Sequence, residues 1–234
     1  HMGIHSPLSF DIVCISTALL FGPGLVWGAV DAQPSSAPIV GEVTTVIGQA
    51  TINHGSGEAY KIRRGQPVHA GDRLETQDGG HVHVRFIDGG MVSVRPLSRL
   101  NIENYSRGDK TTPGAVRFNL ERGVVRSVTG AWGEENRDRF RLNTPVVAIG
   151  IKGTDFVVQA WGDKTQAHVV SGAITMVPLT TCLGGSAVCD GSQTPVLLSA
   201  DMRGKMLEYG SGTYFGHSTQ SPRLISILPQ TSAS

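Results

Sequence analysis

Two basic residues stand out as candidates for binding an anionic group. Lys152 is flanked by Gly150 and Gly153, and Arg126 follows an apolar run. A cation at such a position is unusual in a buried core, so we take both residues as candidate interaction residues. The commoner role of such a cation is to satisfy a carboxylate, such as that of Asp155, or carbonyl oxygens.

The stretch around Lys152 is not a phosphate-binding loop, because the G-x-x-x-x-G-K-[ST] spacing fails and no helical pattern follows. The sequence also lacks the G-x-S-x-G, H-E-x-x-H and S-x-x-K signatures of known enzyme classes. We therefore predict a protein that is not an enzyme, with no catalytic residue, no cofactor and no bound metal. Trp161 could join other aromatic residues in a carbohydrate-stacking platform, although aromatic residues at strand ends more often act as packing lids.

Histidine and aspartate residues offer weaker candidates. His81 and His83 alternate with valines, so both side chains lie on one strand face, where a pair of histidines could bind a metal. A third ligand at fixed spacing is missing, so we favour a solvent-facing polar side of a half-buried strand. The sequence does not decide whether His54 and His69 approach each other. Asp72 follows a glycine before a strand, where the usual role is to cap local N–H groups.

The N-terminal segment predicts export. Ile12 to Val30 contains no Lys, Arg, Asp or Glu, and small residues around Ala32 suit cleavage there. We predict a signal peptide over 1–32 and a mature chain without a transmembrane span, periplasmic or extracellular. The first ten residues lack Lys and Arg, and His1-Met2 suggests an expression scar that replaced the native start. The alternative is an uncleaved membrane anchor, although glycine and proline interrupt this segment.

Cysteine usage agrees with export. Removal of a signal peptide removes Cys14 and leaves Cys182 and Cys189 in a loop rich in glycine and serine. This spacing suits a local disulfide in an oxidising compartment. In the chain-entropy model, closing so short a loop contributes roughly 2.5 kcal/mol, which makes the bond a loop staple. A metal site would need two further ligands, and no cysteine remains to supply them.

The rest of the chain predicts an all-β fold. The sequence contains 30 glycines and 12 prolines, and many short runs alternate apolar with polar residues. The strongest hairpin signal joins His81–Ile87 to Met91–Arg95 across Asp88-Gly89-Gly90. We expect a charged loop at Trp132–Asp138. The stacked antiparallel strands would form a β-sandwich or a short solenoid-like domain.

We expect a linker over 33–38, a β domain over 39–207 and a loosely held tail over 208–234. Within the tail, Leu224, Ile225 and Ile227 form an apolar, strand-like segment that could add to a neighbouring sheet edge. Charges of both signs are mixed along the chain, with 20 Lys and Arg against 19 Asp and Glu. The absence of a basic block argues against a nucleic-acid partner.

Several turn motifs, in order along the chain, resemble the FecR domain, a family of bacterial periplasmic modules. They are Gly71-Asp72-Arg73-Leu74-Glu75-Thr76, Phe86-Ile87-Asp88-Gly89-Gly90, Leu120-Glu121-Arg122-Gly123-Val124-Val125-Arg126, the Thr144-Pro145 to Phe156 segment with Gly150, Gly153 and Thr154, and Gly172-Ala173-Ile174. Lys152 stands where the family usually has arginine, a departure that puts the role of that basic residue in doubt and not the fold.

The resemblance implies a shared periplasmic fold. Sensor members of the family carry a cytoplasmic anti-sigma segment and receive a signal from an outer-membrane iron-siderophore receptor, whereas we expect this chain, with its predicted signal peptide, to lack a cytoplasmic segment that carries that output. We therefore expect an envelope or extracellular protein-interaction or scaffold module without catalysis. Two alternatives are a structural subunit that self-assembles into a filament or surface layer by strand addition, and a module that binds cell-wall glycans or a small ligand.

Overall fold

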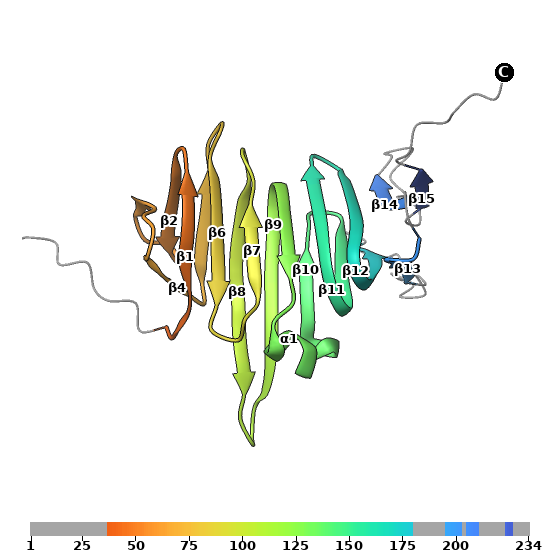
Figure 1. The fold of residues 1–234 in the computed structure, drawn as a ribbon, viewed down its shortest axis with the longest axis horizontal. Helices are drawn as coiled ribbons and strands as arrows, with labels where there is room; N and C mark the ends of the chain where they lie inside the picture. Colours follow the sequence, from red (N-terminus) through yellow and green to blue (C-terminus); the bar gives the residue numbers. More distant parts are fainter. Residues whose placement is uncertain (1–36, 180–194, 203–204, 211–222, 227–234) are drawn as a thin grey trace, which may run out of the picture. The chain divides into compact units, whose positions relative to one another are not determined.

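A computed structural model describes residues 37–179, 195–202, 205–210 and 223–226 (Figure 1). The chain divides into two units, His1–Pro34 and Ser35–Ser234, and every described residue belongs to the second. The predicted signal peptide and the Cys182–Cys189 pair lie outside the described residues, as does Ile227.

Strands dominate the described residues, so the all-β prediction is confirmed. Their bounds are β1 Ile39–Ile47, β2 Ala50–His54, β3 Ala59–Lys61, β4 Pro67–His69, β5 Asp72–Thr76, β6 His81–Phe86, β7 Met91–Val94, β8 Arg99–Gly108, β9 Pro113–Val128, β10 Phe140–Asn143, β11 Val147–Trp161, β12 Lys164–Pro178, β13 Val196–Ser199, β14 Lys205–Gly210 and β15 Arg223–Ser226. A short helix α1, Ala131–Glu135, and a 3-10 turn η1, Arg137–Arg139, stand where a charged loop was predicted, so that prediction was wrong.

The strands form two layers that share the longest strand, β9. In the first layer β4, β1, β6 and β7 pair in that order, and in the second layer β3, β2, β5 and β8 do so. The strand β9 belongs to both layers, because its first part pairs with β8 and β10 and its last part with β7 and β11. Buried side chains from both layers pack into one hydrophobic core, which removes their apolar faces from water.

The pairing of β10 with β9 departs from the predicted antiparallel arrangement. The two strands run parallel, with Phe140 opposite Val116. A parallel pair cannot be joined by a tight hairpin, and here α1 and η1 supply the crossover between the strands. The charged segment around Trp132 therefore returns the chain to the start of β9.

The glycines at 153 and 172 permit a bulge where β11 and β12 bend. The register between these strands shifts between Lys152 and Asp155. Gly153 has φ +60° and Gly172 has φ +80°, and a Cβ on Gly172 would overlap the carbonyl group of Gly153. Only glycine adopts this backbone at such close approach without strain. The proline- and glycine-marked segment that ends at Phe156 therefore contains a bend in a strand.

The predicted hairpin across Asp88-Gly89-Gly90 is confirmed, with Val82 opposite Val94 in β6 and β7. The Asp88 carboxylate holds its turn against the core through hydrogen bonds. It accepts hydrogen bonds from the Gly90 N–H (3.0 Å), the Tyr105 hydroxyl (2.6 Å) and the Trp132 N–H (2.9 Å). Burial first, and then Asp88, raise the pKa of the Tyr105 phenol, which keeps this group a hydrogen-bond donor.

Candidate functional site

One row of side chains crosses the outer face of the first layer. Directly paired residues on neighbouring strands project to the same side of a sheet. The pairings of β6, β7, β9, β11 and β12 place in one row His83, Ser93, Arg126, Val157 and His168. The alternate residues of β6 and β7 are buried valines, so this row faces outward. We call it the first outer face, and we include in it His81 on β6 and Arg95, the exposed residue directly after β7 that acts on His81 and His168.

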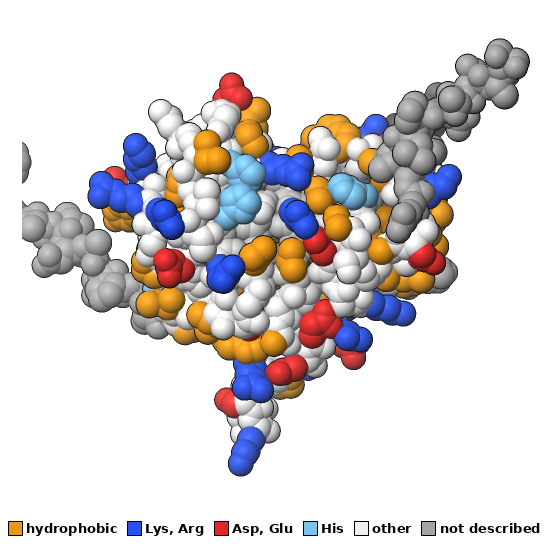
Figure 2. All heavy atoms as spheres, viewed as in Figure 1, with side chains coloured by type: hydrophobic (Ala, Val, Ile, Leu, Met, Phe, Trp, Pro, Cys, Tyr) orange, Lys and Arg blue, Asp and Glu red, His pale blue; other side chains and the backbone are white. Residues whose placement is uncertain are grey.

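The first outer face is rich in groups that can carry positive charge. The rings of His81 and His83 stack 4.5 Å apart, and the Ser93 hydroxyl lies 2.9 Å from His83 Nδ1. Burial lowers the pKa of His81, and His83 and Arg95 lower it further. Figure 2 shows pale-blue histidine side chains beside blue basic side chains on this side of the molecule. The part of this shift that comes from His83 and Arg95 is like-charge repulsion, and it reflects basic groups gathered close together.

His168 experiences the same field at the other end of the row. Burial lowers its pKa, Arg95 and Arg126 lower it further, and Asp155 opposes them. Both histidines are therefore held toward their neutral forms. An approaching carboxylate would oppose that effect and favour their protonation.

Arg126 is fixed in place by Asp155. Its Nε and Nη2 donate to the two carboxylate oxygens at 2.8 and 2.6 Å, a bidentate pair. This is the carboxylate-satisfying role that the sequence favoured. The Arg126 side chain nevertheless remains 44% exposed, so part of the guanidinium can still meet a partner.

Lys152 and Trp161 are exposed residues of β11 on either side of its bend, and the structure does not gather them around Arg126. Arg126 pairs with Val157, five residues after Lys152 and four before Trp161. Lys152 is exposed, and among the described residues its side chain has no hydrogen-bond or ion-pair partner. Trp161 is 40% exposed, and the Lys164 ammonium lies 5.8 Å from its ring centroid. The three candidates thus lie at separate places along these strands.

The other candidate segment pairs within its own chain. Leu224 and Ile225 belong to β15, which is antiparallel to β14, and Leu224 lies opposite Leu207. A strand does form there, as the sequence suggested. In this structure its partner is β14 of the same chain.

The outer face of the second layer has a different electrostatic character, because its charges pair with one another. Arg99 contacts Glu75 at 3.1 Å and Glu121 at 3.2 Å. Arg122 contacts Glu75 at 2.6 Å, and Arg73 contacts Glu121 at 3.0 Å. The hydrogen bond from Arg99 is the largest cause that lowers the pKa of Glu75. This second outer face therefore offers less unbalanced charge to a partner than the first does.

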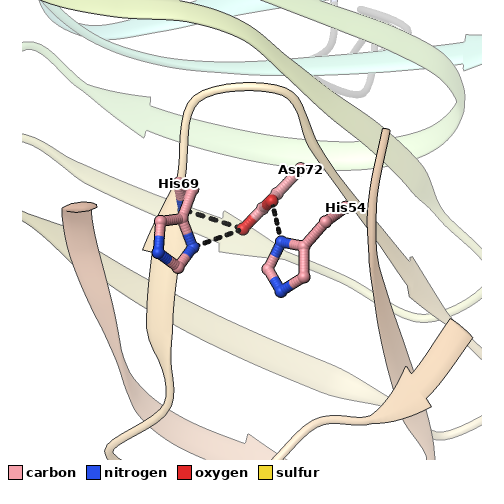
Figure 3. A group of neighbouring side chains, drawn as sticks. All are labelled: His54, His69 and Asp72. Atoms are coloured by element: carbon pink, nitrogen blue, oxygen red, sulfur yellow. Dashed lines mark hydrogen bonds and ion pairs between the residues drawn. The ribbon is translucent and has the colours of Figure 1, made fainter. Parts of the chain in front are cut away.

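A histidine–aspartate cluster lies where the two layers meet at β4, β2 and β5 (Figure 3). Asp72 Oδ2 accepts the His69 N–H at 2.7 Å, the capping role expected for an aspartate after glycine. Asp72 Oδ1 contacts His54 Nδ1, and the two histidine rings lie edge to face at 5.0 Å. The sequence left the approach of the histidines open. The missing information was the pairing of His54 with Asp72 across β2 and β5.

The model of the FecR protein family matches residues 72–175. Over these residues the chain is similar to FecR proteins. The resemblance seen in the turn motifs is thereby confirmed for this part of the chain. The matched region contains Asp88, Arg126, Lys152 and Trp161, whereas His54 and His69 precede it.

Two crystal structures, at 2.50 and 1.65 Å resolution, resemble this chain, and both are described as a "putative anti-sigma factor" from Parabacteroides distasonis ATCC 8503. They are 13% and 12% identical to it in sequence, each with a TM-score of 0.44. Each alignment covers 66% of this chain and 59% of the other, so this chain spans less than two thirds of the length of those proteins. No curated protein sequence matches the chain. No helix among the described residues is long and apolar enough to cross a membrane.

Proposed function

We propose that this protein is a non-catalytic protein-interaction module of the bacterial envelope or extracellular space, and that its first outer face binds an acidic surface of a partner protein. The observation that carries the proposal is the gathering of histidine and arginine side chains on that face, where burial first, and then neighbouring cations, lower the pKa values of two histidines. The similarity to FecR proteins over 72–175 supports an interaction role. Opposite potentials speed encounter and select partners, so an acidic partner is the expected class.

The two outer faces differ in a way that favours this choice. On the second outer face, Arg99 already binds Glu75 and Glu121. A partner that binds these residues would first have to break the existing ion pairs. The free energy lost in breaking them would offset the free energy gained from the new contacts. Arg95 on the first outer face and Lys152 at the bend of β11 are exposed and have no side-chain partner among the described residues. New carboxylates can therefore meet these cations without first displacing old ones.

A partner of a different kind is favoured over self-assembly by strand addition. The segment with Leu224 and Ile225 pairs with β14 of its own chain, so donating it to a second copy would first break that pairing. A monomer in size-exclusion chromatography, with and without residues 211–234, agrees with the proposal. Filaments that vanish on this deletion would support self-assembly instead.

Charge reversal on the two faces tests the proposal. The partner is captured from the native host with the full chain, and its affinity is then measured with purified components by calorimetry. We expect the double variant Arg95→Glu and Lys152→Glu to bind at least about tenfold more weakly, because each change faces carboxylates with a carboxylate. Arg117→Glu is the matched control, since Arg117 is an exposed arginine on β9 within the second layer.

Three results would contradict the proposal. One is equal weakening by the control and the double variant, and another is an affinity that does not fall with added salt. The third is that the partner proves to be a glycan: the wild-type chain is retained on purified peptidoglycan, and the Trp161→Ala variant is not. Export is tested separately by sequencing the N-terminus of the mature protein from the native host. A start at or close to Gln33 is expected, and a start before it would refute the signal peptide.

A further inference from the structure

We infer that His54, His69 and Asp72 form a binding site for one divalent metal ion of the zinc class. The site is distinct from the first outer face and does not depend on the proposed function. The three side chains come from the ends of β2 and β4 and the start of β5. Their ligand atoms all lie within 4.8 Å of one another, close enough to surround a single ion.

The burial of Asp72 is the first argument. Its side chain is 1% exposed, and a buried carboxylate is costly unless positive charge or several donors compensate it. The His69 N–H and the His54 ring are the donors that contact it. A divalent cation would balance the negative charge far better than neutral donors do.

The second argument is a buried nitrogen without a partner. His69 Nδ1 is buried and has no hydrogen-bond partner among the described residues. It lies 3.6 Å from Asp72 Oδ2, which is too long for a hydrogen bond. Two ligand atoms of a tetrahedral zinc ion, each about 2.0–2.1 Å from the metal, lie about 3.4 Å apart. The spacing of this nitrogen and the carboxylate therefore suits two ligands of one ion better than it suits a hydrogen bond.

The outer contacts also fit a metal site. Ligating carboxylates are themselves usually held by hydrogen bonds, and the His69 N–H holds Asp72 Oδ2 at 2.7 Å. The His54 side chain is 33% exposed, which gives the ring room to turn outward and admits water to a fourth position. Two imidazoles and one carboxylate suit Zn²⁺, whereas Ca²⁺ and Mg²⁺ favour sets of oxygen ligands.

The position of the site indicates a structural effect. β4 pairs with β1 in the first layer, whereas β2 and β5 pair with each other in the second. One ion held by His54, His69 and Asp72 would pin the two layers together at this edge. Because the ion would bind the folded state alone, it should raise the unfolding temperature.

The test uses the full chain without a histidine tag. ZnCl₂ is titrated in a calorimeter, Co²⁺ is used as a visible-absorption probe of coordination, and CaCl₂ and MgCl₂ serve as comparison ions. We expect one Zn²⁺ per chain, much weaker binding of Ca²⁺ and Mg²⁺, and a rise in unfolding temperature of about 5–10 °C at a hundred times the dissociation constant.

Three variants locate the site. His54→Ala removes the most exposed ligand, and Asp72→Asn keeps an oxygen that can accept the His69 N–H. Each should weaken Zn²⁺ binding by at least about 100-fold. Loss of a residue that only hydrogen-bonds to a metal ligand already lowers metal affinity about 10–100-fold. The double variant His81→Ala and His83→Ala is the control, because that stacked pair is the other local histidine cluster. It should leave Zn²⁺ affinity unchanged.

Circular dichroism without metal shows whether each variant is folded. If Asp72→Asn does not fold, His54→Ala decides alone. No Zn²⁺ binding to the wild-type chain would overturn the inference, as would unchanged affinity in folded His54→Ala. Loss of the binding in the His81 and His83 control would overturn it too, and would place the ion on the first outer face.

Discussion

Replacing Asp88 by alanine should be among the most destabilising single changes at a partly exposed position of this fold. The carboxylate accepts three hydrogen bonds, from the Gly90 N–H, the Tyr105 hydroxyl and the Trp132 N–H. These donors belong to the hairpin turn, to β8 and to α1, so one side chain joins three separate elements. Alanine would release all three at once.

The expected magnitude follows from those donors. Tyr105 is 3% exposed, and a buried hydroxyl left without an acceptor costs about 1–3 kcal/mol. Each of the two backbone donors contributes about 0.5–1.5 kcal/mol. We therefore expect Asp88→Ala to lower the free energy of unfolding by about 4 kcal/mol, a large effect for one residue. The unfolding temperature should fall by about 8–16 °C.

Urea denaturation followed by circular dichroism measures this effect. Asp78→Ala is the matched control, because Asp78 begins a second Asp-Gly-Gly turn but is exposed and makes no side-chain hydrogen bond within the described residues. The control should change stability by less than about 0.5 kcal/mol. A double-mutant cycle with Tyr105→Phe should show coupling of about 1–2 kcal/mol. A loss below about 1 kcal/mol in Asp88→Ala, or strict additivity in the cycle, would refute this account.

Three further predictions concern other parts of the chain. His81 and His168 have pKa values below the usual 6.5 in the folded protein, so the unfolded chain binds more protons in the window just below 6.5. Stability should therefore fall as the pH drops through that window, and His81→Asn with His168→Asn should flatten the dependence measured by thermal unfolding; an unchanged slope would count against it. Gly172→Ala should cost about 2–4 kcal/mol in urea denaturation, because it combines a left-handed backbone with steric overlap, and a neutral effect would show that the bulge relaxes. Non-reduced mass spectrometry of exported protein should find Cys182 linked to Cys189, whereas two free thiols would refute the disulfide.

Local patterns in the sequence predicted those features that depend on neighbours along the chain. The alternation from Val82 to Phe86 and the Asp88-Gly89-Gly90 turn predicted the β6–β7 hairpin, since both strand faces and the turn residues are contiguous. The segment around Trp132 was predicted as a loop because it is short and highly charged. The helix that it forms is stabilised by a residue elsewhere in the chain. Its first N–H groups include a donor to Asp88, which lies 44 residues earlier.

Features that depend on long-range register could not be predicted in the same way. The row that joins His83 to Arg126 and His168 requires the pairings of five strands, and no local pattern encodes them. The sequence also does not show that β9 belongs to both layers, because one long strand and two short strands have the same alternation of apolar and polar residues. Lys152 and Arg126 were therefore found as unusual residues, whereas the row that contains Arg126 was not.

The cluster of His54, His69 and Asp72 shows why the physical unit is wider than the family match. That match begins at Asp72, yet both histidines lie before it. The same holds for the sheet, because β5 pairs with β2 and β6 pairs with β1. The matched residues therefore pair with strands that the family match does not include. A metal site at this edge would be a property of those added strands, and the likeness to FecR proteins carries no information about it.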